Sequence, residues 1–334
     1  MEIQKPKIEF YVVRSFGAKF SATSDFISEN WKQLFKYVTY FLLPVCLVQA
    51  LSLNTMLDKI MQNAMAIRDG SVLANNEYML IGAGYLGYML AMCIGMLLLS
   101  AIVYGLMDKY DNRANRLNGL TWAEFRPTLS HNIKRGLLVT GAFVVLSFIS
   151  GAVMVLSLTM VPLSIIPIYL AFVVCMVPLS LLFPIYIMED ISIVDAVSKA
   201  FRLGFKTWGG IFALLMVVGI IAYIVMTIVS MPVGIGFVIK AVMFTDGTAS
   251  TGFVATSAYT FLMYLLGILQ SYGMYISYTI VVVALGYQYA HAAEKVDGVS
   301  VEKDIDNFEA MKDENIDAPE LPDMKNEFDD FNKL

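Results

Sequence analysis

The chain has 334 residues, of which 58% are apolar and only 15% are charged, and its mean hydropathy is +0.67. A soluble domain is about 45–50% apolar and about 25% charged. The composition therefore excludes an ordinary soluble enzyme, a disulfide-rich secreted scaffold and a disordered chain, and it indicates a protein that crosses a membrane several times.

The charges are divided between two regions. Residues 294–334 contain 14 acidic residues and 5 lysines, whereas residues 1–293 carry four net positive charges. A basic body suits an anionic membrane surface, and an acidic tail that cannot bury a core is expected to be disordered. The three cysteines lie in apolar runs without CxxC spacing, so we predict neither a metal nor a redox role for them.

Six apolar runs are long enough to span a bilayer at about 20 residues each. They cover residues 34–53, 79–107, 136–160, 163–188, 209–231 and 259–290. Open sheet edges go unsatisfied in lipid and a barrel would show alternating segments, so the runs are predicted to be helices. The predicted fold is all-α: a cytoplasmic segment over 1–33 without a cleavable signal, a six-helix transmembrane domain over 34–290, and a disordered acidic tail over 291–334.

The distribution of Lys and Arg predicts the orientation. With the N-terminus inside, the inner segments hold 15 Lys and Arg residues without the tail, and the outer loops hold 3. The positive-inside rule therefore places both termini in the cytoplasm. Such a protein belongs in the bacterial cytoplasmic (inner) membrane.

Three inner segments, 24–37, 121–138 and 191–212, combine helical apolar spacing with a polar junction before spans one, three and five. Each is predicted to be an amphipathic helix in the membrane plane. The shared pattern suggests a triplicated helix-hairpin repeat, although any inward-to-outward span could favour such a lead-in. In the third segment the predicted apolar face consists of Ile191, Val194, Val197, Ala200 and Phe201. The predicted anchors at the membrane interface are Trp31, Trp208, Arg202 and Lys206.

Two further segments are expected on the outer side. Residues 55–67 are predicted to form a short helix in the first outer loop. The apolar stretch 233–244 is too short to span and is predicted to be a re-entrant or interfacial helix, with Lys240 reaching the headgroups.

Prolines and polar side chains mark a candidate groove for lipid. Four prolines in or beside run four predict a bent or broken helix. Run six is rich in hydroxyl and amide groups, which could line a groove with run four or simply make hydrogen bonds between helices. The candidate groove or lipid-contact residues are Pro178, Pro184, Gln270, Tyr272, Tyr275 and Tyr278.

Signals for catalysis are weak. The two histidines, His131 and His291, belong to no HExxH motif, phosphate-binding loops are absent, and no charge lies in the centre of a run. We expect no cofactor, no metal and no enzymatic activity. Glu189 and Asp190 are interpreted as the N-terminal cap of the third amphipathic helix; the alternative is a polar site. Convergence of both acids with His131 in one cleft would favour an enzyme.

The tail ends in FDDFNKL. Its Phe328, Phe331 and Leu334 are spaced as in a docking peptide that folds on binding a cytoplasmic protein. The alternative is a tail that only increases solubility.

The residues after run four resemble a known pattern. Glu189-Asp190, Asp195-Ala196, the run Phe201-Arg202-Leu203-Gly204 and Trp208 follow a proline-bearing span, with Ala196, Ser198 and Leu203 in the amphipathic helix. This arrangement resembles six-span bacterial membrane proteins that include the membrane domain fused to some glycerophosphodiester phosphodiesterases. The stretch 16–49 is similar to sequences from Bacteroidetes. The resemblance implies a fold over about residues 20–290 and carries over no catalytic residue.

These observations lead to one expected function and one alternative. We expect a non-enzymatic inner-membrane protein that assists or organises lipid or envelope proteins, contacts membrane lipids, binds no nucleic acid and recruits a partner through its tail. The alternative is a carrier or flippase for an apolar or lipidic substrate.

Overall fold

The computed structural model describes residues 6–68, 70, 75–160, 165–245 and 252–301. This part of the chain is helical and contains no strand. Its elements are α1 (Phe16–Arg68), α2 (Asn75–Asn112), α3 (Trp122–Met160), α4 (Ile165–Leu179), α5 (Leu182–Met188), α6 (Ile193–Lys206), α7 (Trp208–Thr245), the short 3₁₀ helix η2 (Phe253–Ala255) and α8 (Ser257–Asp297). Six helical segments are long and apolar enough to cross a membrane, which confirms the predicted fold class.

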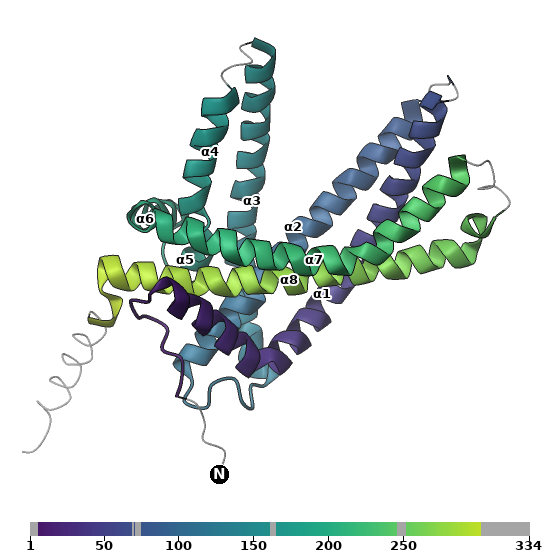
Figure 1. Cartoon of the computed structure of the whole chain (residues 1–334). Coiled ribbons are helices and arrows are strands. Elements are labelled where there is room, and N and C mark those ends of the chain that lie inside the picture. Colours follow the sequence, from purple (N-terminus) through teal and green to yellow (C-terminus); the bar gives the residue numbers. More distant parts are fainter. Residues whose placement is uncertain (1–5, 69, 71–74, 161–164, 246–251, 302–334) are drawn as a thin grey trace, which may run out of the picture.

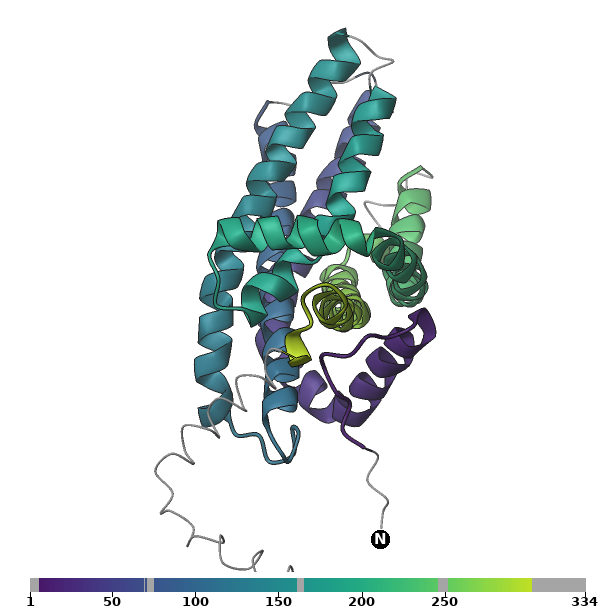
Figure 2. The ribbon, with the colours of Figure 1, turned by 90° about the vertical axis from the view of Figure 1, so that its left-hand side faces the viewer.

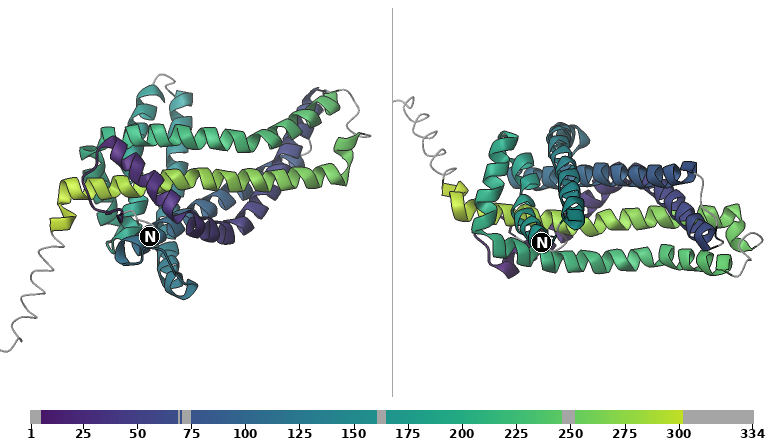
Figure 3. Two further views of the ribbon diagram at one scale, coloured as in Figure 1. Left: turned by 60° about the horizontal axis from the view of Figure 1, so that its bottom comes forward. Right: turned by 90° about the horizontal axis from the view of Figure 1, so that it is seen from above.

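The long helices form three hairpins, α1–α2, α3–α4 and α7–α8. The three hairpins share a common end. The α3–α4 hairpin stands apart from the other two (Figure 1), whereas the α1–α2 and α7–α8 hairpins pack on each other out to the ion pair between Asp58 and Lys240. Seen from above, α7 and α8 run side by side (Figure 3). We call the common end the base; there the start of α1, the end of α2, α5, α6 and the end of α8 meet.

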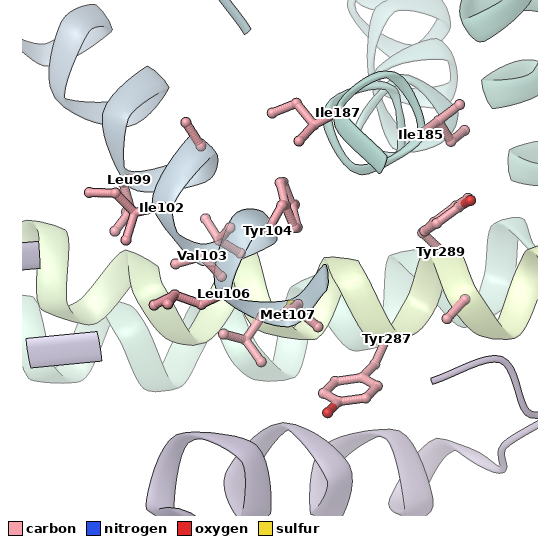
Figure 4. Close-up of a cluster of buried hydrophobic side chains, with 14 of the residues drawn as sticks. Leu99, Ile102, Val103, Tyr104, Leu106, Met107, Ile185, Ile187, Tyr287 and Tyr289 are labelled. Carbon is pink, nitrogen blue, oxygen red and sulfur yellow. The ribbon is translucent and has the colours of Figure 1, made fainter. Parts of the chain in front are cut away.

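The base contains the main hydrophobic core. Figure 4 shows Tyr289 of α8 pointing toward α5 and Tyr287 pointing toward the first part of α1. Both tyrosines are almost completely buried, as is Tyr104 of α2. Small residues let α8 approach its neighbours closely: a Cβ at Gly286 would lie 2.8 Å from the methyl carbon of Met107. Close packing of this kind is typical of a protein core.

The three predicted amphipathic segments differ from one another. The first continues into span one and into residues 55–67 as the single helix α1, which changes direction in Figure 1. The second is the start of α3, which runs straight from the base to its tip, so no separate in-plane helix precedes span three. Only the third forms a helix of its own, α6, which lies crosswise to α3 and α4 (Figure 2).

The buried face of α6 differs from the predicted face. Ala196, Ala200, Leu203 and Gly204 are buried, whereas Val194 is 70% exposed. The face is shifted because Gly204 lies directly against Pro178 of α4. The predicted cap was also wrong: Ser192, and neither Glu189 nor Asp190, caps α6, and its hydroxyl accepts the backbone N–H of Asp195 at 3.2 Å.

The predicted break in run four is confirmed. Helix α4 ends just after Pro178, and α5 begins at Leu182. Proline disfavours a helical conformation in the residue before it and removes one backbone donor, so a helix tends to turn there. The backbone N–H of Leu181 donates instead to the carbonyl of Pro178 at 3.1 Å.

The predicted re-entrant helix over 233–244 is not formed. Helix α7 continues through Pro232 to Thr245. Packing on α8 and α1 supports this part: Val233 is buried, the Tyr259 hydroxyl donates to the carbonyl of Gly236 at 2.7 Å, and Lys240 pairs with Asp58 of α1. Lys240 is therefore tied to a carboxylate of α1.

Helix α8 extends beyond the predicted end of span six. It ends at Asp297, where Gly298 adopts a left-handed conformation (φ 65°) that suits glycine. Residues 291–297, predicted to belong to the tail, are therefore part of this helix. The tail residues Phe328, Phe331 and Leu334 lie outside the described residues.

Candidate functional site

The strongest polar cluster of the described chain lies at the base, between α5, α6 and α8. Its centre is Glu189, whose Oε2 accepts from Nζ of Lys199 at 2.8 Å and whose Oε1 accepts from the Tyr289 hydroxyl. The side chain of Glu189 is only 18% exposed. Because a charge-assisted bond in a sheltered position is strong, this contact ties α8 to the α5–α6 linker.

Asp297 at the end of α8 forms the second half of this cluster. Its two carboxylate oxygens accept from the guanidinium of Arg202 at 2.7 and 3.0 Å, and Lys199 lies 3.5 Å away. The predicted interface anchor Arg202 is thus a bidentate ion-pair partner that joins α6 to α8.

Arg135 of α3 holds the linker from the opposite side. Its Nε donates to the carbonyl of Tyr186 at 2.6 Å, and its Nη2 donates to the carbonyls of Glu189 and Ile191 at 2.7 and 2.8 Å. The guanidinium also lies 3.9 Å from the centre of the Tyr186 ring. The last carbonyls of a helix have no partner within it, so Arg135 satisfies the end of α5 and fixes the start of α6.

The two adjacent acids and His131 do not share a cleft. Asp190 is 84% exposed and lies 3.2 Å from Nε2 of His131. Glu189 lines a hollow of about 290 Å³ over α6 and the linker, and neither Asp190 nor His131 is among the residues that line it. Among the described residues no three metal-ligating side chains form a group. The arrangement that would have favoured an enzyme is therefore not formed.

The segment before α1 completes the base. The Tyr11 hydroxyl lies 3.4 Å from that of Tyr289, and the backbone N–H of Arg14 donates to Nδ1 of His291 at 2.9 Å. Burial raises the pKa of Tyr11 to about 12, so this phenol stays neutral at physiological pH. Sequence reasoning missed this contact, because residues 6–15 have no helical period; the aromatic pair Phe10-Tyr11 was the only available signal.

Runs four and six pack on each other through α5, whereas α4 packs mainly on α6, α3 and α7, and α8 packs mainly on α1, α7 and α2. The groove between runs four and six stays a prediction. Tyr275 is buried and donates to Oε1 of Gln49 at 2.9 Å, and Tyr272 bonds to Thr39 of α1.

The remaining groove residues lie apart from one another. Pro178 and Pro184 are buried at the α4–α5 break, while Gln270 and Tyr278 are half-buried on α8. Of the predicted groove residues, Tyr272 and Tyr275 join α8 to the α1–α2 hairpin.

The predicted anchors lie in different surroundings. Trp31 is exposed on α1 and Lys206 is exposed at the end of α6. Trp208 is partly buried: its indole N–H donates to the carbonyl of Val174 at 3.1 Å, and its ring stacks on Phe212. At least Trp208 thus helps to hold α7 against α4.

The fold and this site together define a multi-pass helical membrane protein with a tightly joined polar base. Comparison with protein-family models, with curated proteins and with solved structures gave no match to this chain. The resemblance to the phosphodiesterase-associated membrane domain stays a prediction.

Proposed function

We propose that this chain is a non-enzymatic integral protein of the bacterial inner membrane that organises lipids or other membrane proteins, with its base and both termini in the cytoplasm. In this proposal the protein acts by offering surfaces to which lipids or other membrane proteins bind. The observation that carries this proposal is the position of the α3–α4 hairpin. Beyond the base, this hairpin projects away from the other helices (Figure 1). Only 6% of the most apolar stretch of α3 is buried, compared with 50% for α8.

The exposed face of α3 suits contact with another helix. Gly141, Val145, Phe148 and Ala152 repeat at helical spacing and are all exposed, and a Cβ at Gly141 would meet no atom within 4 Å. In lipid, helices associate where small residues let backbones approach and larger side chains interlock. A face with both features favours a membrane-spanning partner on this hairpin.

The charges support a second contact on the inner side. The excess of Lys and Arg in the segments around the base favours a cytoplasmic position for it. The acidic tail, with Phe328, Phe331 and Leu334 at its end, would then lie in the cytoplasm and recruit a soluble partner.

Photo-crosslinking in the native membrane tests this function. A photoreactive residue would replace Phe148, which is 74% exposed on α3, and the matched control would replace the similarly exposed Tyr223 on α7. We expect a discrete protein adduct from position 148 and only lipid adducts from position 223. Lipid adducts alone at both positions would refute the proposed contact.

A carrier for a lipidic substrate is the second candidate. Amide groups within the spans favour it: Nε2 of Gln49 and Oε1 of Gln270 are buried and have no hydrogen-bond partner among the described residues. Unsatisfied polar groups are costly in lipid and often mark a path for polar groups. A carrier predicts that Gln270→Leu abolishes lipid transfer in proteoliposomes while loss of the tail is tolerated. The organiser predicts that loss of the tail matters and that Gln270→Leu does not.

A further inference from the structure

Lys19 of α1 is a buried cation whose charge is not compensated. Its side chain lies at the base and is only 4% exposed. Its Nζ donates to Oε1 of Gln288 in α8 at 2.7 Å, and no carboxylate of the described chain forms an ion pair with it. An ammonium group has three donors, and a buried charge without a counter-ion is strongly unfavourable. The site therefore lacks an anionic acceptor.

A second donor points to the same place. Gln288 is completely buried, and its Nε2 has no hydrogen-bond partner among the described residues. Both donors lie beside Gly210 in the first turn of α7. A Cβ at Gly210 would lie 3.6 Å from Nζ of Lys19 and 3.9 Å from Nε2 of Gln288. Both donors therefore converge on the backbone of the first turn of α7 at Gly210.

The surroundings of these two donors favour a negative charge. Helix α7 begins at Trp208, so Gly210 lies at the positive end of the helix dipole. Lys295, two turns beyond Gln288 on α8, lies near enough to Lys19 for the two charges to repel each other. The neighbouring Gly209 is exposed. Figure 2 shows the starts of α1 and α7 next to the last part of α8.

We propose that Lys19, Gln288 and the first turn of α7 form a binding site for one phosphate oxyanion, supplied either by a lipid headgroup or by free phosphate. A phosphate offers several acceptor oxygens, which can satisfy the remaining ammonium donors and the amide N–H together. The site lies where the first part of α1 meets the inner ends of spans five and six. It does not depend on the proposed organising role.

The test uses the full-length chain in detergent micelles, titrated with dioleoyl phosphatidylglycerol and, separately, with inorganic phosphate. Gly210→Ala places a methyl group between the two donors and the ligand, at ordinary contact distance from both donors, so the variant is expected to fold; Gly209→Ala is its control, because a Cβ there meets nothing within 4 Å. Lys19→Met removes the charge, and Lys36→Met, at an exposed position on the same helix, is its control.

Native mass spectrometry and melting curves report binding. We expect one bound phosphate-bearing molecule per chain, at least about tenfold weaker binding in Gly210→Ala and Lys19→Met, and unchanged binding in both controls. Phosphatidylglycerol that inorganic phosphate does not displace identifies a headgroup site, and binding of inorganic phosphate alone identifies a free-ion site; both support the proposal. Wild-type affinity in the two site variants for both probes, or no binding of either probe to the wild type, overturns it. Lys19→Met is also expected to melt at a higher temperature than the ligand-free wild type, since it removes a buried charge.

Discussion

Replacing Gly204 by alanine tests whether α6 is docked rigidly on α4. A Cβ at position 204 would lie 2.5 Å from both the Cα and the Cβ of Pro178. Carbon atoms in contact normally stay about 3.5–4.0 Å apart, so one helix must move by about 1 Å. The obstacle is largely backbone of a proline at the α4–α5 break, which cannot rotate away as a long side chain can.

The expected cost follows from two opposing effects. Extra atoms in a well-packed contact cost about 1–3 kcal/mol, while glycine to alanine within a helix stabilises by up to about 1 kcal/mol. We therefore expect the free energy of unfolding of Gly204→Ala to fall by about 1–2 kcal/mol. In a thermal melt of the purified protein this corresponds to a decrease of several degrees.

The matched control is Gly219→Ala in α7, where a Cβ meets no atom within 4 Å. This variant should melt at or slightly above the wild-type temperature, because only the helix propensity changes. If Gly204→Ala melts together with the wild type, α6 does not pack on α4 as described.

Three further predictions concern the charged side chains that join the helices. Glu189→Gln should lower the free energy of unfolding by about 1.5–3 kcal/mol, whereas Asp190→Asn should cost less than about 1 kcal/mol because that side chain is exposed; parallel melting curves check this. Arg135→Lys loses the planar fork that holds three carbonyls, so amide hydrogen exchange in the α5–α6 linker should become faster, and an unchanged rate there would contradict its assigned role. Lys240→Asp should destabilise the protein by about 1–2 kcal/mol and the added Asp58→Lys should restore it, whereas a separate re-entrant helix predicts no rescue.

The spans could be predicted from the sequence because their signal is local. A run of about 20 apolar residues is by itself enough to predict a membrane-spanning helix. The break in run four follows equally from its prolines. Pro232 is also a proline in an apolar run, yet α7 continues through it. The difference lies in the neighbouring helices, because Tyr259 of α8 and Asp58 of α1 hold the segment after Pro232 in place. These contacts cannot be predicted from the sequence around Pro232 alone.

The site was harder to predict because both sides of α8 are apolar with scattered polar groups. The spacing of polar and apolar residues along α8 does not show that Tyr275 faces Gln49 of α1 and not run four. Glu189 pairs with Lys199, which lies 10 positions away in the sequence, and Asp297 pairs with Arg202, which lies 95 positions away. The sequence placed these charges in inner segments, but their pairing follows from the tertiary fold.

The central claim is that this protein acts by holding another membrane component. The most direct test is native mass spectrometry of the chain released from its own membranes, comparing the full length with a form that ends at Val301, which keeps the whole of α8 and its glycine cap. We predict that the full-length chain carries a second polypeptide and that the shortened form loses it or holds it more weakly. If both forms emerge without any other protein, the organising role is contradicted.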